Sequence, residues 1–474
     1  MKKISHRKKR APSNSRKSKS SKTKSVVPAA AQDLAASLLR LLNHLPLDPL
    51  ARASGFRQRQ PKKLTPLLFV QAACLLVTLG SASYRRWAGL IGVLGQCTLT
   101  KQALFERMTD RAVRFLQSAL QALLATLAST ASGAPVSAEL LSFGRVLLLD
   151  STTVKVSKKL AAFFPGPRNQ RGAHGGMLKI QACFDLLSQS FVAFSLSSYR
   201  HNDQAASPQV LPLLQPGDLV VRDLGYFVLE VLEQIATAHA FFLSRLRLGV
   251  SVWEADGHTP VNLLARLRRA GHLDAQFCLG EKKVPVRLVA IRLPAAVAAE
   301  RRRQARQNRD RRSAPSAERL ALLGWAIFIT NVPARVWSAR TVARMYGLRW
   351  RIETIFKAWK SHFALTEVPD GSRAQVQSLV YGKLIFITLF QVSFWRPWWA
   401  ELGGQERPAL SLLKVAEAVQ SGLLALVLYE LGVDPRRAWA DLIGTHCRYE
   451  RRRRRHFMQD LAERIAADCG SKMK

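Results

Sequence analysis

The sequence predicts an α/β protein in which a mixed sheet, interrupted by a β-rich insertion, lies between an all-helical N-terminal region and C-terminal helices. From Gln32 to about Ser132, apolar residues recur at helical spacing. The stretch Arg145–Val156 then opens with a continuous apolar run that ends in an acid, the pattern of a central strand buried on both faces. Helical patterns return later, and long apolar helices are expected around 376–394 and 410–431.

Composition indicates a folded protein with a polyanionic partner. The chain has 474 residues and is 48% hydrophobic, enough for the cores of two or three domains. Its formal net charge of +40 comes from 72 Lys and Arg against 32 Asp and Glu. Residues 1–25, which we expect to be disordered, hold 11 of the basic residues and no acid, so the folded body is basic as well. Nucleic acid is the leading candidate partner.

The spacing of the cysteines and the length of the apolar segments indicate the cellular compartment of the protein. Six cysteines are spread singly, without a Cys-x-x-Cys pair, which indicates a reduced, cytosolic protein without structural zinc. The most apolar segments are short or are interrupted by Lys383 and Gln391. We therefore expect no membrane span and no secretory signal.

The N-terminal helical region contains one candidate for reading DNA. Thr100 and Thr109 are suited to cap two successive helices. A helix-turn-helix is one interpretation of this segment, and a plain helical hairpin, the more common arrangement, is the other.

The core elements follow in a defined order. After the strand that ends at Asp150, strands are expected at 177–185 and 191–197, then a short helix at 209–214. A fourth strand ends at Asp223, and a helix at 227–239 and a strand at 240–244 complete the alternation. This is the order of the ribonuclease-H-like fold, in which the acid-bearing first and fourth strands lie side by side.

Between Arg245 and Ala334 the pattern breaks into short β-like pieces around an Arg-rich segment, Glu300–Arg312. Seven arginines in thirteen residues form either a solvated face or, as we expect in a chain this basic, a phosphate-contacting surface. The predicted organisation is a basic tail (1–25), a helical and possible DNA-binding domain (26–140), a catalytic core in two parts (141–245 and 335–400), the β-rich insertion (246–334), and C-terminal helices with a basic tail (401–474).

The segment Tyr346–Lys360 has the composition of a helix buried on one side. At about 100° per residue, Tyr346, Arg349, Glu353 and Lys360 fall at roughly 0, 300, 340 and 320° on the helical wheel. One stripe therefore carries a phenol, a guanidinium, a carboxylate and an ammonium. Alone, the stripe is either a salt-bridge face or part of an active site.

Three acids, taken together, favour the interpretation of this stripe as part of an active site. Asp150 and Asp223 end neighbouring strands, and Glu353 sits on a helix laid across the sheet. Such carboxylates repel one another unless cations neutralise them. Oxygen ligands without His or Cys suit Mg²⁺ or Mn²⁺, and two such ions support in-line phosphoryl transfer.

Tyr346, Arg349, Glu353 and Lys360 are separated by two, three and six residues. This spacing resembles the Tyr-Arg-Glu-Lys signature of bacterial insertion-sequence transposases with a DDE triad, the insertion-sequence-four family. The text from Leu348 to Lys360 matches that family's Arg-Trp-x-Ile-Glu core, with support from the turn that ends at Asp203. The resemblance covers about 142–395.

The resemblance implies a role for each matched residue. It implies that the metal-binding triad is Asp150, Asp223 and Glu353, and that the phosphate beside the cleavage site is contacted by Tyr346, Arg349 and Lys360. In the best-understood cut-and-paste members, a tryptophan of the β insertion stacks on a flipped base, and Trp325 looks like that residue. A core tryptophan that anchors the insertion is the alternative for Trp325. We interpret Trp350 and Trp359 as core residues.

By this resemblance the chain is expected to be a DNA transposase that nicks element ends and joins them to target DNA. The implied partners are double-stranded DNA, as transposon ends and as target, and a second copy of the chain in a homodimer. The implied location is the bacterial cytoplasm, in association with the nucleoid. Two alternatives stay open: a nuclease of the same fold without strand transfer, and a captured, non-catalytic DNA-binding protein.

Overall fold

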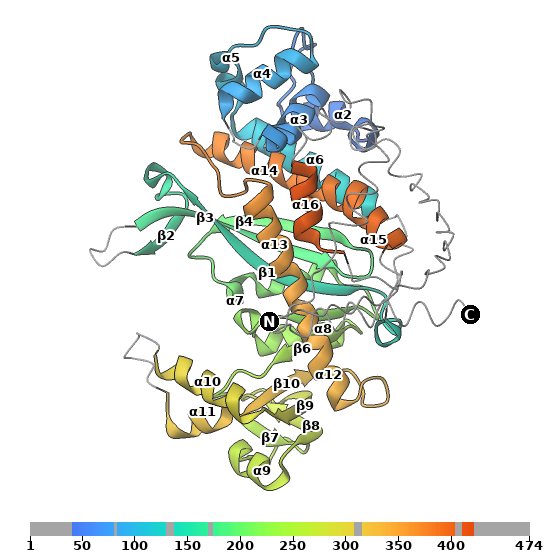
Figure 1. Ribbon diagram of the computed structural model, residues 1–474, viewed down its shortest axis with the longest axis vertical. Coiled ribbons are helices and arrows are strands. Elements are labelled where there is room, and N and C mark those ends of the chain that lie inside the picture. The colour runs from blue at the N-terminus through green and yellow to red at the C-terminus, as the bar shows by residue number, and fades with distance from the viewer. Residues whose placement is uncertain are drawn as a thin grey trace, which may run out of the picture.

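The structure is a computed structural model, and it describes residues 40–79, 83–128, 137–168, 174–307, 315–402 and 410–420. The tail at 1–25, the second half of the helix expected at 410–431, and the arginine run at 448–455 lie outside the described residues. Figure 1 shows the N-terminal helices at one end of the molecule, the sheet in the middle, and the insertion at the other end.

The N-terminal region is helical, as its periodicity predicts. Its α-helices are α2 (Leu47–Ala53), α3 (Pro66–Leu75), α4 (Tyr84–Leu94), α5 (Lys101–Arg107) and α6 (Asp110–Ala128), and a 3₁₀ turn follows α3 (Leu76–Leu79). The hydroxyl of Thr100 caps α5 by accepting a hydrogen bond from the Ala103 N–H at 3.1 Å. The other predicted cap, Thr109, directly precedes α6.

The first part of the core carries the strands that the acid-ended runs predict. They are β1 (Val146–Val156), β3 (His174–Asp185), β4 (Ser190–Ser198), β5 (Leu219–Arg222) and β6 (Phe241–Arg245), with a short additional strand β2 (Pro165–Arg168). The sheet order is β2-β3-β1-β5-β6-β10-β9-β8-β7, and β4 pairs with β3. Strands β1 and β5 are parallel, with Leu149 opposite Arg222, so Asp150 and Asp223 follow at the same end of adjacent strands. The predicted adjacency of the two acid-bearing strands is confirmed.

Helical turns connect these strands. They are α7 (Asp203–Ala206), the 3₁₀ helix η5 (Ser207–Leu213), the 3₁₀ turn η6 (Leu224–Tyr226) and α8 (Leu229–Thr237). The helix expected at 209–214 is thus a 3₁₀ helix. Pro208 and Pro212 lie within it, and because proline lacks an N–H it disfavours regular α-helical hydrogen bonding there.

The insertion continues the sheet. It contains β7 (Val252–Glu254), β8 (Leu273–Leu279), β9 (Val284–Arg292), β10 (Trp325–Thr330), α9 (Leu263–Ala270), α10 (Ala295–Arg306) and α11 (Ala317–Leu322). Strand β10 pairs antiparallel with both β9 and β6. The side chain of Asn331 reinforces this junction, because its amide donates to the Ala240 carbonyl at 2.9 Å and its oxygen accepts from the Phe242 N–H at 2.8 Å.

The second part of the core is helical. It comprises α12 (Ala339–Tyr346), a 3₁₀ turn η8 (Gly347–Arg349), α13 (Trp350–His362), α14 (Arg373–Phe390), a π-helical turn η9 (Gln391–Trp395), α15 (Arg396–Leu402) and α16 (Leu412–Gln420). The segment expected as one helix from Tyr346 to Lys360 therefore tightens at 347–349, beside the weak helix former Gly347. Its backbone angles stay in the right-handed helical region, so Tyr346 and Arg349 keep the direction of the stripe.

Two apolar cores lie on opposite faces of the sheet. Alternate residues of β1 serve different cores: Val146 and Leu148 pack with the helices of the second core part, whereas Leu147 and Leu149 pack with α8. Because successive side chains of a strand point to opposite faces, Asp150 and Ser151 also face opposite sides. This alternation determines what each of them contacts.

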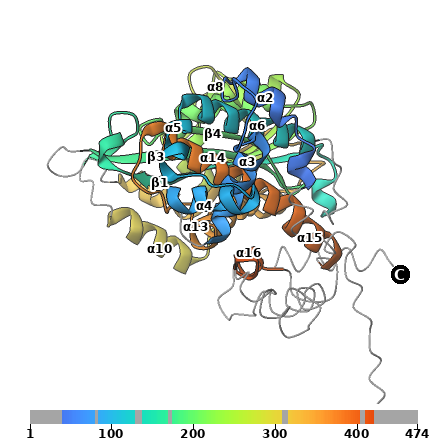
Figure 2. The ribbon, with the colours of Figure 1, turned by 90° about the horizontal axis from the view of Figure 1, so that it is seen from above.

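Helix α14 is the central helix of the larger core. In the view of Figure 2 it lies beside α3 and α6, against which it packs. A Cβ on Gly382 would lie 2.9 Å from the Cβ of Ala73, so the glycine allows α14 to approach α3 closely. The stretch Arg373–Ala400 is long and apolar enough to cross a membrane, but 89% of its apolar window is buried inside this protein. Packing within the protein thus accounts for its apolar composition.

Candidate active site

Three carboxylates from three separate elements meet at the end of the β1–β5 pair. Asp150 follows the continuous buried run at the start of β1, Asp223 follows β5 as the N-cap of η6, and Glu353 lies in the first turn of α13. Each aspartate is oriented by a backbone N–H: Ser151 donates to Asp150 Oδ1 at 2.8 Å, and Gly225 donates to Asp223 Oδ2 at 3.3 Å.

The guanidinium of Arg349 lies between these carboxylates. Its Nη1 is 2.5 Å from Glu353 Oε1 and 3.8 Å from Asp150 Oδ2, and its Nε is 3.4 Å from Asp223 Oδ1. The Arg349 side chain is only 10% exposed. Burial lowers the pKa of Arg349, but the charges of Asp223 and Glu353 outweigh burial and raise it above the ordinary value. One cation therefore holds three mutually repelling anions together.

The carboxyl group of Asp150 is largely buried, and its pKa is far from the ordinary value. Burial raises the pKa of Asp150 to about 7, and the negative charges of Asp223 and Glu353 add to this effect. The Ser151 N–H and Arg349 act in the opposite direction. A buried carboxyl with this environment needs more positive charge nearby to stay ionised at neutral pH.

The donor chemistry of this cluster fits Mg²⁺ or Mn²⁺, which prefer carboxylate oxygen. Among the residues that the structure describes, no three acidic, His or Cys side chains lie close enough to bind one ion jointly. The carboxylates instead surround Arg349, which supplies the positive charge that they require.

The remaining members of the predicted stripe differ in their surroundings. Tyr346 is 8% exposed, and its ring packs on Phe328 with 5.2 Å between centroids. Burial raises the pKa of Tyr346 to about 12, and both Arg349 and Asp223 are near enough to influence it. Lys360 is exposed in the last turn of α13. Tyr346 therefore adjoins the carboxylates, and Lys360 lies farther along the same helix.

The three tryptophans of interest have separate environments. Trp325 begins β10, and its indole N–H donates to the Gly271 carbonyl at 3.3 Å, within the insertion. Trp359 is 1% exposed, which confirms it as a core residue. Trp350 is 53% exposed, with its ring 5.1 Å from the Arg349 guanidinium, so its prediction as a core residue is wrong. The exposure of Trp350 could have been inferred from the helical wheel, where it falls at roughly 40°, beside Tyr346 and the polar stripe.

The N-terminal helices carry a separate basic hollow. It has a volume of about 780 Å³ and lies between the loop 55–63 and α5. Six cations and one acid line it: Arg57, Arg59, Lys62, Lys63, Arg107, Arg111 and Glu106. An excess of five positive charges in one hollow suits a phosphate backbone.

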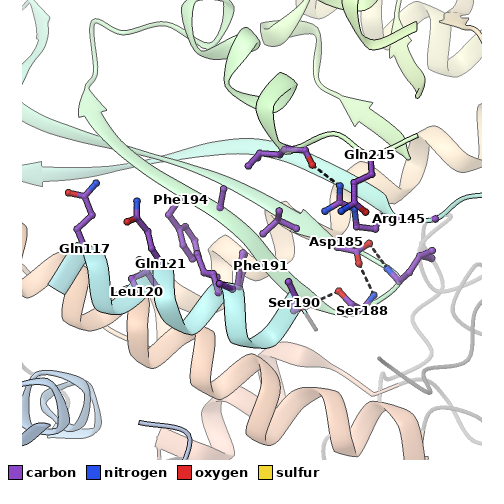
Figure 3. Close-up of a pocket in the computed structure, with 18 of the residues that line it drawn as sticks. Gln117, Leu120, Gln121, Arg145, Asp185, Ser188, Ser190, Phe191, Phe194 and Gln215 are labelled. Carbon is purple, nitrogen blue, oxygen red and sulfur yellow. Dashed lines mark hydrogen bonds between the residues drawn. The ribbon is translucent and has the colours of Figure 1, made fainter. Parts of the chain in front are cut away.

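A further hollow of about 690 Å³ lies between α6 and the β4 side of the sheet (Figure 3). Its charged groups are already paired: Arg145 binds Asp218 through two hydrogen bonds, and Asp185 accepts from the backbone N–H groups of Val146, Leu187 and Ser188. It contains none of the three converging carboxylates, so this hollow is separate from the candidate active site.

Comparison with known proteins gives concordant matches. The family model described as "Transposase DDE domain" matches residues 141–389. The transposase of insertion sequence element IS231E from Bacillus thuringiensis subsp. finitimus is 28% identical over 364 residues, covering 72% of this chain and 76% of the relative. The transposase of IS1151 from Clostridium perfringens is 25% identical over 312 residues, covering 61% and 65%.

Among solved structures, the chain is similar to the piggyBac transposase synaptic complex with hairpin DNA, with a TM-score of 0.40 and 9% identity. That match covers 88% of this chain and 84% of the other. The matched family model includes all three converging carboxylates and spans more than half of the 474 residues. The chain therefore belongs to the family of transposases with a DDE domain.

Proposed function

We propose that Asp150, Asp223 and Glu353 form the catalytic centre of this DNA transposase, which cuts the ends of its element and joins them to target DNA. The observation that carries the proposal is the convergence of these carboxylates, from β1, η6 and α13, around Arg349. Curated relatives named as transposases of insertion sequences support the reaction class.

The three carboxylates would hold Mg²⁺ or Mn²⁺, two ions in all, which when bound activate the attacking oxygen and stabilise the leaving oxygen of a phosphoryl transfer. The backbone N–H groups of Ser151 and Gly225 keep Asp150 and Asp223 oriented for that purpose. Burial of Asp150 limits the water around it and strengthens its interaction with any cation.

Arg349, Tyr346 and Lys360 would hold the phosphate beside the cleavage site. Arg349 is already next to the carboxylates, so a phosphate brought there gains a bidentate donor. Trp325 would stack on a base of the element end, an interaction worth about 1 to 3 kcal/mol per base. Trp350 is exposed beside Arg349 and offers an aromatic surface next to the guanidinium.

The core would be a ribonuclease-H-like sheet. The strand neighbours β4-β3-β1-β5-β6 support this, with β1 antiparallel to β3 and parallel to β5. The α/β class itself, a mixed sheet with helices on both faces, is observed.

DNA outside the catalytic centre would meet the basic surfaces of the protein. The hollow beside α5 and the arginines of α10 are two regions with dense positive charge. A homodimer in the bacterial cytoplasm, with one active site for each element end, suits a substrate that has two ends.

The proposal is tested with labelled DNA that carries the sequences flanking this reading frame. Wild-type protein with Mg²⁺ is expected to nick the end and then to form strand-transfer products with a target plasmid. Asp150→Asn, Asp223→Asn and Glu353→Gln are each expected to abolish both steps and to retain DNA binding. Because each substitution is nearly isosteric, loss of binding would indicate misfolding.

Two other outcomes identify the alternatives. Cleavage without strand transfer, in a substrate that offers two paired ends, would indicate a nuclease. Binding without cleavage by the wild-type protein, in Mg²⁺ and in Mn²⁺, would indicate a non-catalytic DNA-binding protein.

A further inference from the structure

Asp203 is the centre of a polar cluster on the face of β1 opposite Glu353. Its Oδ1 accepts hydrogen bonds from Ser151 Oγ at 3.0 Å, Gln181 Nε2 at 3.1 Å and Lys179 Nζ at 3.2 Å. Lys179 and Gln181 are almost fully buried in β3, and Gln181 stands opposite Ser151 in the β1–β3 pairing. Buried polar residues in a strand interior are costly unless each has a partner, and Asp203 is the partner that they share.

Ser151 connects this cluster to the first catalytic aspartate. Its side-chain hydroxyl donates to Asp203, whereas its backbone N–H donates to Asp150 Oδ1 at 2.8 Å. The position of the Ser151 backbone is therefore determined by Asp203 on one face of β1 and transmitted to the Asp150 carboxylate on the other.

Gly225 makes the equivalent connection to the second aspartate. Its backbone N–H donates to Asp223 Oδ2 at 3.3 Å. A Cβ added to Gly225 would lie 3.2 Å from Asp203 Oδ2 and 3.5 Å from Asp223 Oδ2, so the Asp203 carboxylate packs directly on this glycine. Both residues that donate to the catalytic aspartates thus contact Asp203.

The rest of the cluster keeps Asp203 in place. Tyr226 donates its hydroxyl hydrogen bond to Gln181 Oε1, and its backbone carbonyl accepts from Ser207 Oγ at 3.0 Å, four residues after Asp203. The side chain of Asn202 caps α7 by accepting from the Ala205 N–H at 2.8 Å. Segment 202–207 is therefore tied to η6, and η6 to β3, by hydrogen bonds that do not involve Asp203.

We propose that Asp203 is a positioning residue of the transposase, which fixes the separation of the Asp150 and Asp223 carboxylates through Ser151 and Gly225. The inference rests on the proposed function of these two aspartates. Asp203 acts from behind the site, because its Oδ1 is already occupied by three donors, one of them a lysine. In metal centres, groups that orient the ligands in this way typically affect metal affinity or activity by about 10- to 100-fold.

The test uses full-length protein and labelled element-end DNA. Asp203→Ala is expected to lower the single-turnover cleavage rate by about 10- to 100-fold and to raise the half-saturating Mn²⁺ concentration. Mn²⁺ binding to the protein–DNA complex, measured by electron paramagnetic resonance, is expected to weaken in parallel, while the Kd for DNA stays unchanged. Asp203→Asn keeps an acceptor for Ser151 and is expected to recover part of the loss.

Ser195→Ala is the matched control, because Ser195 lies opposite Gln181 in the β3–β4 pairing and its hydroxyl bonds Gln209 at 2.8 Å, away from Asp203. It is expected to cleave at the wild-type rate with wild-type Mn²⁺ dependence. An equal loss in Ser195→Ala and Asp203→Ala would overturn the proposal, and so would wild-type cleavage and Mn²⁺ binding in Asp203→Ala.

If Asp203→Ala does not fold, Ser151→Ala tests the positioning role instead, because it removes one hydroxyl and keeps the backbone N–H. A several-fold loss of cleavage with weaker Mn²⁺ binding supports the positioning role, and wild-type behaviour overturns it. A wild-type protein that binds Mn²⁺ but never cleaves would refute the proposed function instead. In that case weaker Mn²⁺ binding by Asp203→Ala would still be expected.

Discussion

Arg349 neutralises Asp150, Asp223 and Glu353 in the protein alone. Under the proposed function it would also contact the DNA phosphate beside the cleavage site. A cation that binds the carboxylates would compete with Arg349 for them and would release the guanidinium toward phosphate. Metal binding and phosphate binding are therefore expected to favour each other at this site.

Removing the Arg349 charge tests its counter-ion role. Arg349→Met is expected to lower the free energy of unfolding by about 1 to 3 kcal/mol without divalent metal, because three carboxylates lose their shared cation. Mg²⁺ is expected to restore more stability to this variant than to the wild type. Thermal unfolding with and without Mg²⁺ measures both effects, and an equal response of the two proteins to Mg²⁺ would contradict the counter-ion role.

The raised pKa of Asp150 makes stability depend on pH. The folded-state pKa of about 7 lies above the unfolded value near 4, so the folded protein keeps a proton that the unfolded chain releases. The free energy of unfolding should therefore fall as pH rises from about 4 to 7, by about 2 to 3 kcal/mol between pH 5 and pH 8. The variant Asp150→Asn should lack this part of the pH dependence of the free energy of unfolding.

Urea unfolding at several pH values without divalent metal checks this expectation. Since all other titrating groups are common to both proteins, the difference between wild type and Asp150→Asn isolates Asp150. A difference that does not change with pH would show that Asp150 titrates at its ordinary pKa.

At the residue scale, the sequence predicts the three acids because each has a local signal: two end apolar strands and one lies on a polar helical stripe. It does not predict that Arg349 sits between them, because a helical wheel shows direction and gives no contact across elements. Asp203 was visible only as part of a turn, since its partners Lys179 and Gln181 come from a strand more than twenty residues earlier.

At the scale of elements, α13 determines where Glu353 lies. It is anchored by Trp359, whose ring centroid is 5.2 Å from that of Phe191 and 6.0 Å from that of Phe194, both in β4. The helix is thus fixed against the sheet by aromatic packing, and Glu353 is carried on a rigid support.

Two tryptophans of this helix give a matched pair of substitutions. Trp359→Ala is expected to cost about 3 to 5 kcal/mol of unfolding free energy, because it leaves a large cavity in the core. Trp350→Ala is expected to change stability by no more than about 0.5 kcal/mol, because its side chain is 53% exposed. Chemical denaturation measures both, and equal losses would contradict the burial seen here.

The strands of the core are predictable because their apolar runs are local and end at turns or acids. The junction between the insertion and the core is not predictable in this way. Strand β10 pairs with β6 across about eighty residues of chain, and pairing over such a distance leaves no periodic signal in either strand. The break at Gly347 is likewise small enough for a helical pattern to run through it.

At the scale of the whole molecule, part of the excess positive charge is concentrated in one hollow. The hollow beside α5 carries six cations and one acid, and none of the three converging carboxylates lines it. Under the proposed function, element DNA would thus be bound at two places, by its phosphates in the basic hollow and by its cleavage site at the three carboxylates.

The double variant Arg59→Gln/Lys62→Gln tests the hollow. Both residues are exposed at its rim, and losing two phosphate contacts should lower the slope of log Kd against log salt concentration by about 2. The variant Arg268→Gln/Arg269→Gln removes the same charge from the exposed end of α9 and should leave the slope nearly unchanged. Fluorescence anisotropy at several salt concentrations measures the slope, and equal changes in both variants would mean that only net charge matters.

The most direct test of the metal-bound carboxylate centre is the rate of end cleavage by Asp150→Cys in Mg²⁺ and in Mn²⁺. A thiolate is a poor ligand for Mg²⁺ and a better one for Mn²⁺. If Asp150 binds the metal, the variant loses cleavage in Mg²⁺ and regains at least about tenfold of it in Mn²⁺. The wild-type rate in Mg²⁺, or an equal loss in both metals, would contradict a role for Asp150 as a metal ligand.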